Sequence, residues 1–216
     1  MARRLAGDGI SVVLCTPHYS RIYPTTLERT RQELDLLRDA LLHLTIPLTL
    51  HLAAEVSPPK LLEAPLDELA ARAIGDRYLI VEVKHDTSPD FVGIALERLG
   101  PMGLSPIFAH PERSQQVGDD LRLLGSAREA GALVQVVAPS LAGSWGIETR
   151  LRAWRLVAEG IADLVATDAH GAVAAPPLGT IANYVEERVG SEQGQALFEG
   201  NAKRLLAGVR GHAPTP

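Results

Sequence analysis

Acidic and histidine side chains recur in this sequence at the ends of short apolar runs. The residues that share this position are His18, Glu55, Glu82, His110, Asp168 and His170. If the runs are parallel strands, their carboxyl ends open onto one face, where barrels of this class do their chemistry. Imidazole and carboxylate groups together suit divalent ions such as manganese, iron or zinc. The pattern therefore predicts a metal-dependent site at that face.

Glu82 is the most informative member of this set. It lies within Tyr78–Val83, an almost wholly apolar run. A carboxylate buried there would cost several kcal/mol unless it is paired or bound to a metal. Asp168 and His170 are two residues apart, so in extended backbone they point the same way. Three converging carboxylates would repel one another unless cations neutralise them.

The set carries more weight than any one member. A lone histidine after a strand usually caps or hydrogen-bonds, so His18 alone would be weak evidence for a ligand. Arg113 has a bland interpretation as a surface cation beside Glu112. Trp145 and Trp154 are expected to be packing residues rather than a binding platform.

Apolar runs and amphipathic stretches alternate along the chain, which indicates strand–helix units around a buried parallel sheet. A closed or nearly closed barrel is the first choice. A doubly wound open sheet is the alternative, although no Gly-rich phosphate loop follows any strand. The predicted strands are Ile10–Cys15, Leu48–Val56, Tyr78–Val83, Ser105–Ala109, Leu133–Val137 and Ala162–Ala166. The predicted helices include one capped by Thr25, and Pro65–Ile74, Phe91–Leu99, Asp119–Ala130, Ile147–Glu159, Thr180–Val189 and Glu192–Leu206.

Composition limits the function classes. The 216 residues carry a formal net charge of −5, which gives no basic surface for nucleic acid. No apolar run is long enough to cross a bilayer. The single cysteine, Cys15, suggests a reducing compartment, and hence the cytoplasm. We expect one domain over residues 1–208 and a flexible tail over residues 209–216.

Several motifs together resemble a known family. The chain is similar to the polymerase-and-histidinol-phosphatase (PHP) type of protein-tyrosine phosphatase found in bacterial capsule and exopolysaccharide clusters. The motifs are Cys15-Thr16-Pro17-His18, Ala54-Glu55, Tyr78-Leu79-Ile80-Val81-Glu82, Ala109-His110-Pro111-Glu112-Arg113 and Thr167-Asp168-Ala169-His170. They occur in the family's order and spacing between about His18 and Pro177.

The resemblance implies a distorted (β/α)7 TIM-like PHP barrel with up to three metal ions, commonly Mn²⁺, with iron, zinc or magnesium as alternatives. It implies removal of phosphate from a tyrosine kinase that controls polysaccharide export. Carried over by position, the ligands of a central ion are Glu55, Glu82 and His110. Glu55 and Asp168 resemble part of a second site, and His18 and His170 part of a third. Arg113 resembles a phosphate-binding arginine, and a guanidinium fork suits phosphate. His170 or Asp168 would protonate the leaving phenolate.

The sequence departs from the family in two places. The family's first strand, with its His-x-His pair and a later aspartate, has no counterpart, because only a helical stub, Ala2–Gly7, precedes Ile10. Ala175 stands where the family tends to have a second arginine. We therefore expect that Met1 is an internal position of a longer protein, that about one ion binds tightly, and that the phosphatase activity is weak. An open barrel seam would invite self-association.

Two rival functions follow. The first is a catalytically inactive PHP-like domain that binds or regulates a partner. The second is a related hydrolase, such as a histidinol-phosphate phosphatase or an amidohydrolase.

Overall fold

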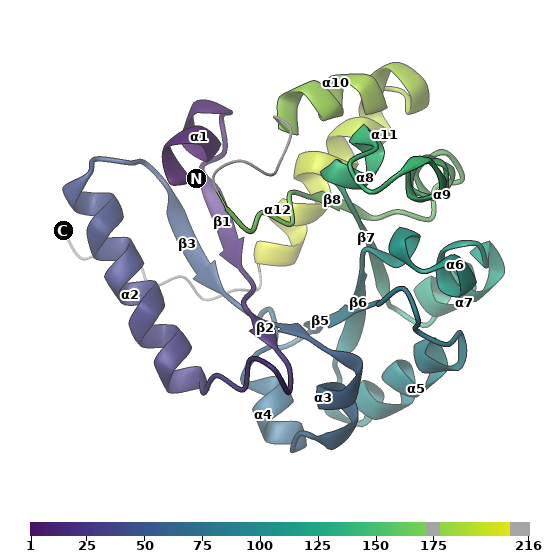
Figure 1. Cartoon of the computed structure of the whole chain (residues 1–216), viewed down its shortest axis with the longest axis horizontal. Coiled ribbons are helices and arrows are strands. Elements are labelled where there is room, and N and C mark those ends of the chain that lie inside the picture. Colours follow the sequence, from purple (N-terminus) through teal and green to yellow (C-terminus); the bar gives the residue numbers. More distant parts are fainter. Residues whose placement is uncertain (172–177, 208–216) are drawn as a thin grey trace.

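The protein is built around parallel strands, which lie in the middle of a surrounding layer of helices (Figure 1). The computed structural model describes residues 1–171 and 178–207. Six strands pair in the order β2-β4-β5-β6-β7-β8, and β1 and β3 form a separate parallel pair. The strands are β1 (Val12–Cys15), β2 (His18–Tyr19), β3 (Thr49–Leu52), β4 (Glu55–Val56), β5 (Tyr78–Glu82), β6 (Ser105–Ala109), β7 (Leu133–Val137) and β8 (Leu164–Ala166). The predicted α/β class with a parallel sheet is confirmed.

The first two predicted strands are each divided into two segments. The run ending at Cys15 continues past Pro17 into β2, and the second run is β3 followed by β4. Hydrogen bonds bridge the breaks, since Ala53 N donates to Cys15 O (3.0 Å) and Glu55 N to Pro17 O (3.2 Å). This continuous ladder aligns His18 with Glu55.

The sheet has two apolar faces with different partners. Leu79, Val81 and Phe108 pack with the surrounding helices in the larger core cluster. Ile80 and Ile107 belong to a smaller cluster that we call the inner face, whose buried members are Ala53, Ile74, Ile80, Ile107, Ala109 and Leu164. Because side chains alternate along a strand, Glu55 lies on the same face as Ala53, and Glu82 on the same face as Ile80. The acidic residues therefore continue the inner face at its carboxyl end.

The opposite end of the inner face is covered by the last helix. Ala202 and Leu205 pack against the inner-face cluster. Asn201 Nδ2 donates to Asp163 O (2.7 Å), directly before β8. Among the described residues, β2 and β8 end the strand order without pairing to each other, so hydrogen bonds do not close the sheet into a barrel.

The helices follow the predicted alternation with local differences. They are α1 (Ala2–Gly7), α2 (Leu27–His43), α3 (Pro58–Glu63), α4 (Leu66–Ala70), α5 (Asp90–Leu99), η1 (Gly100–Met102), η2 (Pro111–Arg113), α6 (Gln115–Gly118), α7 (Leu121–Glu129), α8 (Ala138–Ala142), α9 (Ile147–Ala158), α10 (Leu178–Val189), α11 (Ser191–Gln195), η3 (Ala196–Gly200, a π-helix) and α12 (Asn201–Leu206). The N-cap of α2 is Thr26, which accepts from Arg29 N (3.2 Å), so the prediction of Thr25 is wrong by one residue.

Several short helices were not predicted from the sequence, among them α3, α6 and α8. Both α3 and α8 carry proline in their first turn, where the missing N–H leaves no hydrogen bond unmade. The Pro65–Ile74 helix is shorter than predicted, since α4 ends at Ala70. No helix among the described residues is long and apolar enough to cross a membrane. Ala175 and the predicted tail over residues 209–216 lie outside the described residues.

Candidate functional site

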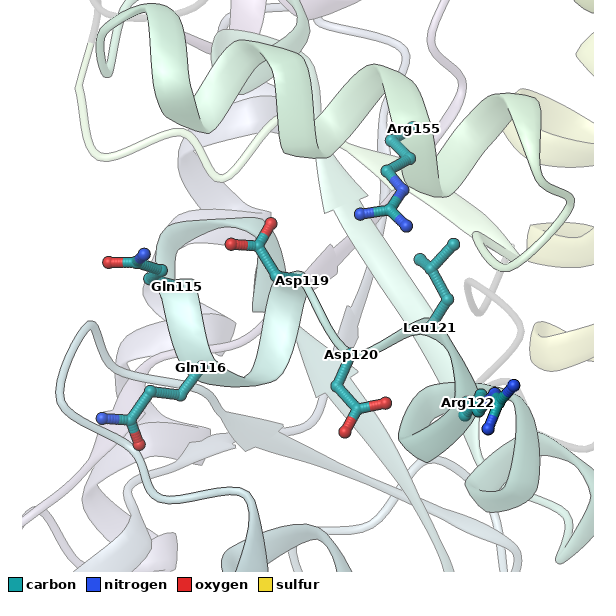
Figure 2. A pocket seen from close by; sticks show the side chains of 7 residues that line it. All are labelled: Gln115, Gln116, Asp119, Asp120, Leu121, Arg122 and Arg155. Carbon is teal, nitrogen blue, oxygen red and sulfur yellow. The ribbon is translucent and has the colours of Figure 1, made fainter.

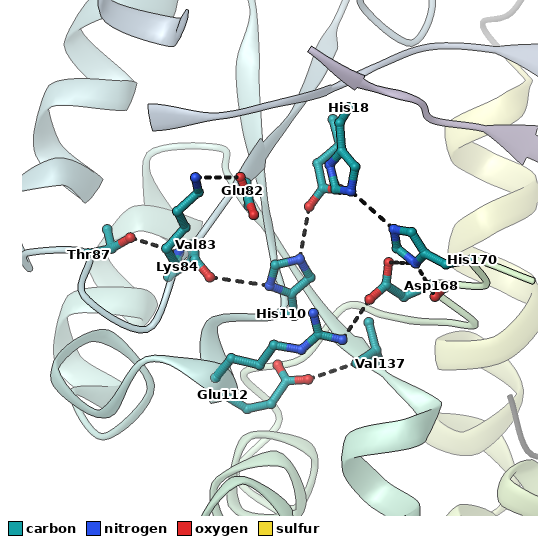
Figure 3. A network of polar contacts seen from close by, with 12 residues as sticks. His18, Glu82, Val83, Lys84, Thr87, His110, Glu112, Val137, Asp168 and His170 are labelled. Carbon is teal, nitrogen blue, oxygen red and sulfur yellow. Dashed lines mark hydrogen bonds and ion pairs between the residues drawn. The ribbon is translucent and has the colours of Figure 1, made fainter. Parts of the chain in front are cut away.

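The predicted site residues come from neighbouring strand ends. His18 lies in β2, Glu55 in β4 and Glu82 at the end of β5. His110 directly follows β6, and Asp168 follows β8 after one intervening residue. Figure 3 shows the side chains of His18, Glu82, His110 and Asp168 facing a common region.

Four of these side chains form a continuous chain of contacts across the two edges of the sheet. His170 Nε2 is 3.1 Å from His18 Nε2. His18 Nδ1 is 3.2 Å from Glu55 Oε2, and His110 Nε2 is 2.9 Å from Glu55 Oε1. The Glu55 carboxylate thus has an imidazole at each oxygen. Because β2 and β8 are the two edge strands of the sheet, the His18–His170 contact joins β2 to the loop after β8.

His110 is held in one orientation by its backbone and its second ring nitrogen. Its φ of 41° is in the left-handed region, which is strained for a non-glycine residue and is concentrated at functional sites. Nδ1 is 3.2 Å from Val83 O. A carbonyl only accepts, so Nδ1 carries a proton and Nε2 faces Glu55. Metal-binding histidines typically have this arrangement.

Burial and hydrogen bonding have opposite effects on the pKa values of Glu55 and His110. Burial alone would raise the pKa of Glu55, but hydrogen bonds from His110 and His18 lower it to about 2. The pKa of His18 is raised, chiefly by its hydrogen bond to Glu55. Burial would lower the pKa of His110, but the hydrogen bond and charge of Glu55 raise it. Without a metal, Glu55 therefore favours the protonated forms of both imidazoles, and the imidazoles favour the ionised form of Glu55.

Glu82 lies near the His170–His18–Glu55–His110 contacts but does not take part in them. Its partner among the described residues is Lys84, with Nζ 3.6 Å from Oε2. The side chain is 19% exposed, so Glu82 is less buried than its apolar strand predicts. The negative charge of Glu82 nevertheless contributes to raising the pKa of His18.

Arg113 and Asp168 form a second part of the site. Arg113 Nη2 donates to Asp168 Oδ2 (2.6 Å). Asp168 has a left-handed φ of 47°, and its carbonyl accepts from His170 Nδ1 (3.0 Å). The guanidinium carbon of Arg113 lies 4.4 Å from the ring centre of Trp145. Sequence reasoning did not link Trp145 to the site.

The loop between β6 and α6 has buried support that the sequence analysis treated only as part of a motif. Glu112 is fully buried, and its Oε1 accepts from Val137 N (3.1 Å). Burial raises the pKa of Glu112. Gly118 packs so closely that an added Cβ would lie 2.6 Å from Pro111 O. This packing fixes the segment that carries His110 and Arg113.

Each acidic side chain of the site has a cationic partner in the structure. Glu55 is paired with histidines, Glu82 with Lys84, and Asp168 with Arg113. The cations that relieve the predicted repulsion are therefore side chains of the protein itself. Because these pairs already offset the negative charges, repulsion between carboxylates does not require a metal ion here. Support for a metal ion comes from the donor types of the side chains.

The predicted ligands fit a divalent ion in donor type and pairwise spacing. Two ligands that each lie about 2.0–2.2 Å from one ion are about 3 Å apart, close to the His110–Glu55 and His18–Glu55 separations of 2.9 and 3.2 Å. However, among residues 1–171 and 178–207 no group of three His, Cys, Asp or Glu side chains is arranged to hold an ion. In this set, Glu82 contacts Lys84 (3.6 Å) and has no described contact with Glu55 or His110.

A surface depression lies elsewhere on the molecule (Figure 2). Its lining comes from α6, α7, the segment between them, and α9: Gln115, Gln116, Asp119, Asp120, Leu121, Arg122 and Arg155. Asp120 caps α7 by accepting from Leu123 N (2.9 Å). The depression contains no predicted site residue, so it is separate from the chemistry described above.

Comparison with known proteins identifies the family. A family model described as "Capsular polysaccharide synthesis, CpsB/CapC" matches residues 1–207. The chain belongs to this family. It is 31% identical over 209 residues to tyrosine-protein phosphatase YwqE of Bacillus subtilis (strain 168), covering 95% of this chain and 82% of YwqE. It is 26% identical over 172 residues to putative tyrosine-protein phosphatase CapC of Staphylococcus aureus, covering 79% of this chain and 68% of CapC.

A solved structure of the same CpsB/CapC group has the same fold. It comes from work on YwqE of Bacillus subtilis and CpsB of Streptococcus pneumoniae, described there as unique metal-dependent tyrosine phosphatases. The TM-score is 0.83 at 27% sequence identity, and the match covers 97% of this chain and 86% of the other. The resemblance predicted from the motifs is confirmed at the level of the family.

Proposed function

We propose that this CpsB/CapC family member is a metal-dependent protein-tyrosine phosphatase of a capsule or exopolysaccharide cluster. The observation that carries the proposal is the contact chain His170–His18–Glu55–His110, with Arg113 beside it on Asp168. Together these groups supply metal-type donors and a phosphate-type cation at one opening. The relatives' description as metal-dependent tyrosine phosphatases supports the same reaction.

A divalent ion, for which we propose Mn²⁺, would be held by Glu55, His110 and Glu82, with His18, Asp168 and His170 available to further ions. When bound, such an ion lowers the pKa of water toward neutrality and offsets phosphate charge. To bind the ion, His18 and His110 must each lose the ring proton that faces Glu55. Glu82 would have to turn from Lys84 toward the histidines.

Arg113 is proposed to bind the phosphate, because its side chain is 23% exposed and its buried Nε has no hydrogen-bond partner among the described residues. Phosphate would compete with Asp168 for the guanidinium. His170 is proposed to protonate the leaving phenolate. Its side chain is 59% exposed, whereas the Asp168 carboxylate is already paired with Arg113.

Ala175, where the family tends to have an arginine, favours a weaker phosphate site in this chain. The alternative function is therefore a catalytically inactive domain that binds a partner.

The natural substrate that we propose is a phosphotyrosine-bearing kinase in the cytoplasm. We propose no nucleic acid as a partner.

The test compares substrates and variants in the presence of added Mn²⁺. We expect hydrolysis of a phosphotyrosine peptide in preference to histidinol phosphate, abolished by Glu82→Ala. Glu63→Ala is the matched control, since Glu63 pairs with Arg21 on the surface, and it should keep the activity. Two results would contradict the proposal. One is a Glu82→Ala variant that still hydrolyses both substrates, and the other is an unmodified protein that does not hydrolyse the phosphotyrosine peptide.

We also propose that residues 1–208 form a single TIM-like PHP barrel with its seam between β2 and β8, one strand short of seven. The contact between His18 and His170 across these edges supports this arrangement. Unpaired strand edges favour association with another strand, so self-association through this seam is expected. Light scattering that finds only monomers at high concentration would contradict that expectation.

A further inference from the structure

Trp145 is an exposed aromatic residue placed directly against the proposed phosphate-binding arginine. The residue is 55% exposed, although an indole normally avoids that much contact with water. One face of its ring lies against Arg113, with the guanidinium carbon 4.4 Å from the ring centre. An exposed aromatic ring beside a reactive centre is available to a ligand.

The turn that carries Trp145 holds it in this position. Gly146 N donates to Gly143 O (3.2 Å), which closes a four-residue turn with Trp145 third. Both glycines have φ of 90°, which side-chain-bearing residues rarely adopt. The turn follows α8, whose residues Ala138–Leu141 are all buried. The position of the indole is therefore set by a turn anchored on the core.

The second tryptophan provides an internal comparison. Trp154 also lies under an arginine, with the Arg188 guanidinium carbon 4.7 Å from its ring. It differs in packing against the larger core cluster and in donating through Nε1 to Leu141 O (3.1 Å). Trp154 has the structural role predicted for both tryptophans. Trp145 does not share it, since more than half of its surface is open.

The geometry relates the indole to the group that a phosphate carries. In an aryl phosphate, only the ester oxygen separates the phosphorus from the ring. A phosphate bound to Arg113 with its ester oxygen toward Trp145 would therefore place the attached aromatic ring beside the indole. Aromatic rings attract each other in offset or edge-on arrangements at about 4.5–7 Å between centres. An alkyl phosphate at the same arginine offers no such ring.

We propose that Trp145 forms one wall of an aryl subsite and selects aryl over alkyl phosphate esters. This inference rests on the proposed phosphatase function, which it deepens by naming a residue that determines substrate class. Arg113 holds the phosphate and Trp145 holds the ring attached to it. Without a bound phosphate, the Arg113 guanidinium donates to Asp168 (2.6 Å).

A binding experiment tests the subsite without turnover. The chain contains two tryptophans, so Trp154→Phe leaves Trp145 as the only indole fluorophore. Titration with phenylphosphonate should quench or shift its emission, and methylphosphonate at the same concentrations should do so much less. The Trp145→Phe protein, which reports Trp154, should respond to neither. Equal responses to both phosphonates, or none to either, would overturn the inference.

A kinetic experiment separates contact with substrate from mere positioning of Arg113. Trp145→Ala should lower kcat/KM for phenyl phosphate by about 3- to 10-fold and leave kcat/KM for glycerol phosphate nearly unchanged, while Trp145→Phe should restore much of the loss. An equal loss for both esters would mean that Trp145 only positions Arg113, and no loss would mean that it does neither; both results overturn the inference. If the unmodified protein hydrolyses neither ester, the proposed function fails, and the phosphonate titration still decides the subsite.

Discussion

Strand β8 separates two arginine–aspartate pairs whose surroundings are very different. Before the strand, Asp163 is paired with Arg128, whose Nε and Nη2 both donate to it at 2.7–3.2 Å, and it also accepts from Val134 N (2.9 Å). After the strand, Asp168 receives one guanidinium hydrogen bond, from Arg113 (2.6 Å). Asp168 also has a strained backbone, with φ of 47°. The first pair is saturated with partners, whereas the second keeps capacity for a ligand.

This contrast extends to the two ends of the sheet. At the amino end, α12 covers the inner face through Ala202 and Leu205. At the carboxyl end, Glu55 is paired with both His18 and His110 over the same face. We therefore expect changes at the carboxyl end to reduce activity and changes at the amino end to reduce stability.

The largest effect is expected for Glu55→Gln. The variant keeps the shape of the side chain but removes the charge that lies between His18 and His110. A bound divalent ion contributes several kcal/mol to phosphate chemistry, so kcat/KM for a phosphotyrosine peptide should fall by roughly 1,000-fold. Glu63→Gln, at a surface ion pair with Arg21, should change it by less than about twofold. If Glu55→Gln retained a tenth of the activity, the assignment of Glu55 would be wrong.

The next effect separates the two aspartates directly. Asp168→Asn should reduce kcat by roughly 100-fold with little change in melting temperature, because asparagine tolerates the left-handed backbone. Asp163→Asn should instead destabilise the fold by about 2 kcal/mol, reduced from a fully buried pair because Arg128 is 33% exposed.

Thermal unfolding and activity measured on the same preparations check both parts. For Asp163→Asn we expect a melting temperature lower by about 4–8 °C and unchanged turnover per folded molecule. A variant pair that loses stability and activity together would remove the distinction between the two ends.

A smaller effect is expected from a glycine behind the site. In Gly118→Ala the new methyl group would meet Pro111 O at 2.6 Å, so the segment carrying His110 must move, at a cost of about 1–2 kcal/mol. Gly125→Ala is the matched control in α7, because its methyl group would lie 3.9 Å from Ile161 Cδ1 and alanine favours a helix. Chemical denaturation should rank Gly125→Ala at or above the unmodified protein and Gly118→Ala below it. The reverse ranking would refute the close packing of this loop.

The smallest effect is a pH dependence of stability in the metal-free protein. The folded pKa of Glu55 is depressed from 4.5 to about 2, so its contribution is present above pH 4.5 and is lost as the pH falls toward 2. The pKa of His110 is raised above 6.5, so its contribution is complete below pH 6.5 and is lost as the pH rises through the raised value. Urea unfolding of chelator-treated protein should show a loss of stability as the pH rises above 6.5, and Glu55→Gln should weaken this loss. An equal pH dependence in both proteins would contradict the pairing.

The sequence predicted the positions of the site residues because strand ends are readable from apolar periodicity. Glu55, His110 and Asp168 could be placed at one face from that pattern alone. The partners of these residues could not be predicted, because contacts such as His18 with His170 join segments 152 residues apart. The saturated Asp163 pair was missed for the same reason, since its partners come from α7 and β7.

Other features depended on local geometry that a sequence states only weakly. Trp145 reads as an ordinary packing residue until the turn between Gly143 and Gly146 is seen to hold it outward. Glu82 was expected to be buried among ligands, whereas Lys84, two residues along, pairs with it. The predicted N-cap of α2 differs from the observed one by one residue, because Thr25 and Thr26 are both able to cap a helix.

The most direct test of the central claim is the stoichiometry of Mn²⁺ binding, measured by equilibrium dialysis and elemental analysis at pH 7.5. We predict about one retained ion per chain for the unmodified protein and for Glu63→Gln, and none for Glu55→Gln. Retention of the ion by Glu55→Gln, or no retention by the unmodified protein, would contradict a metal centre built on Glu55.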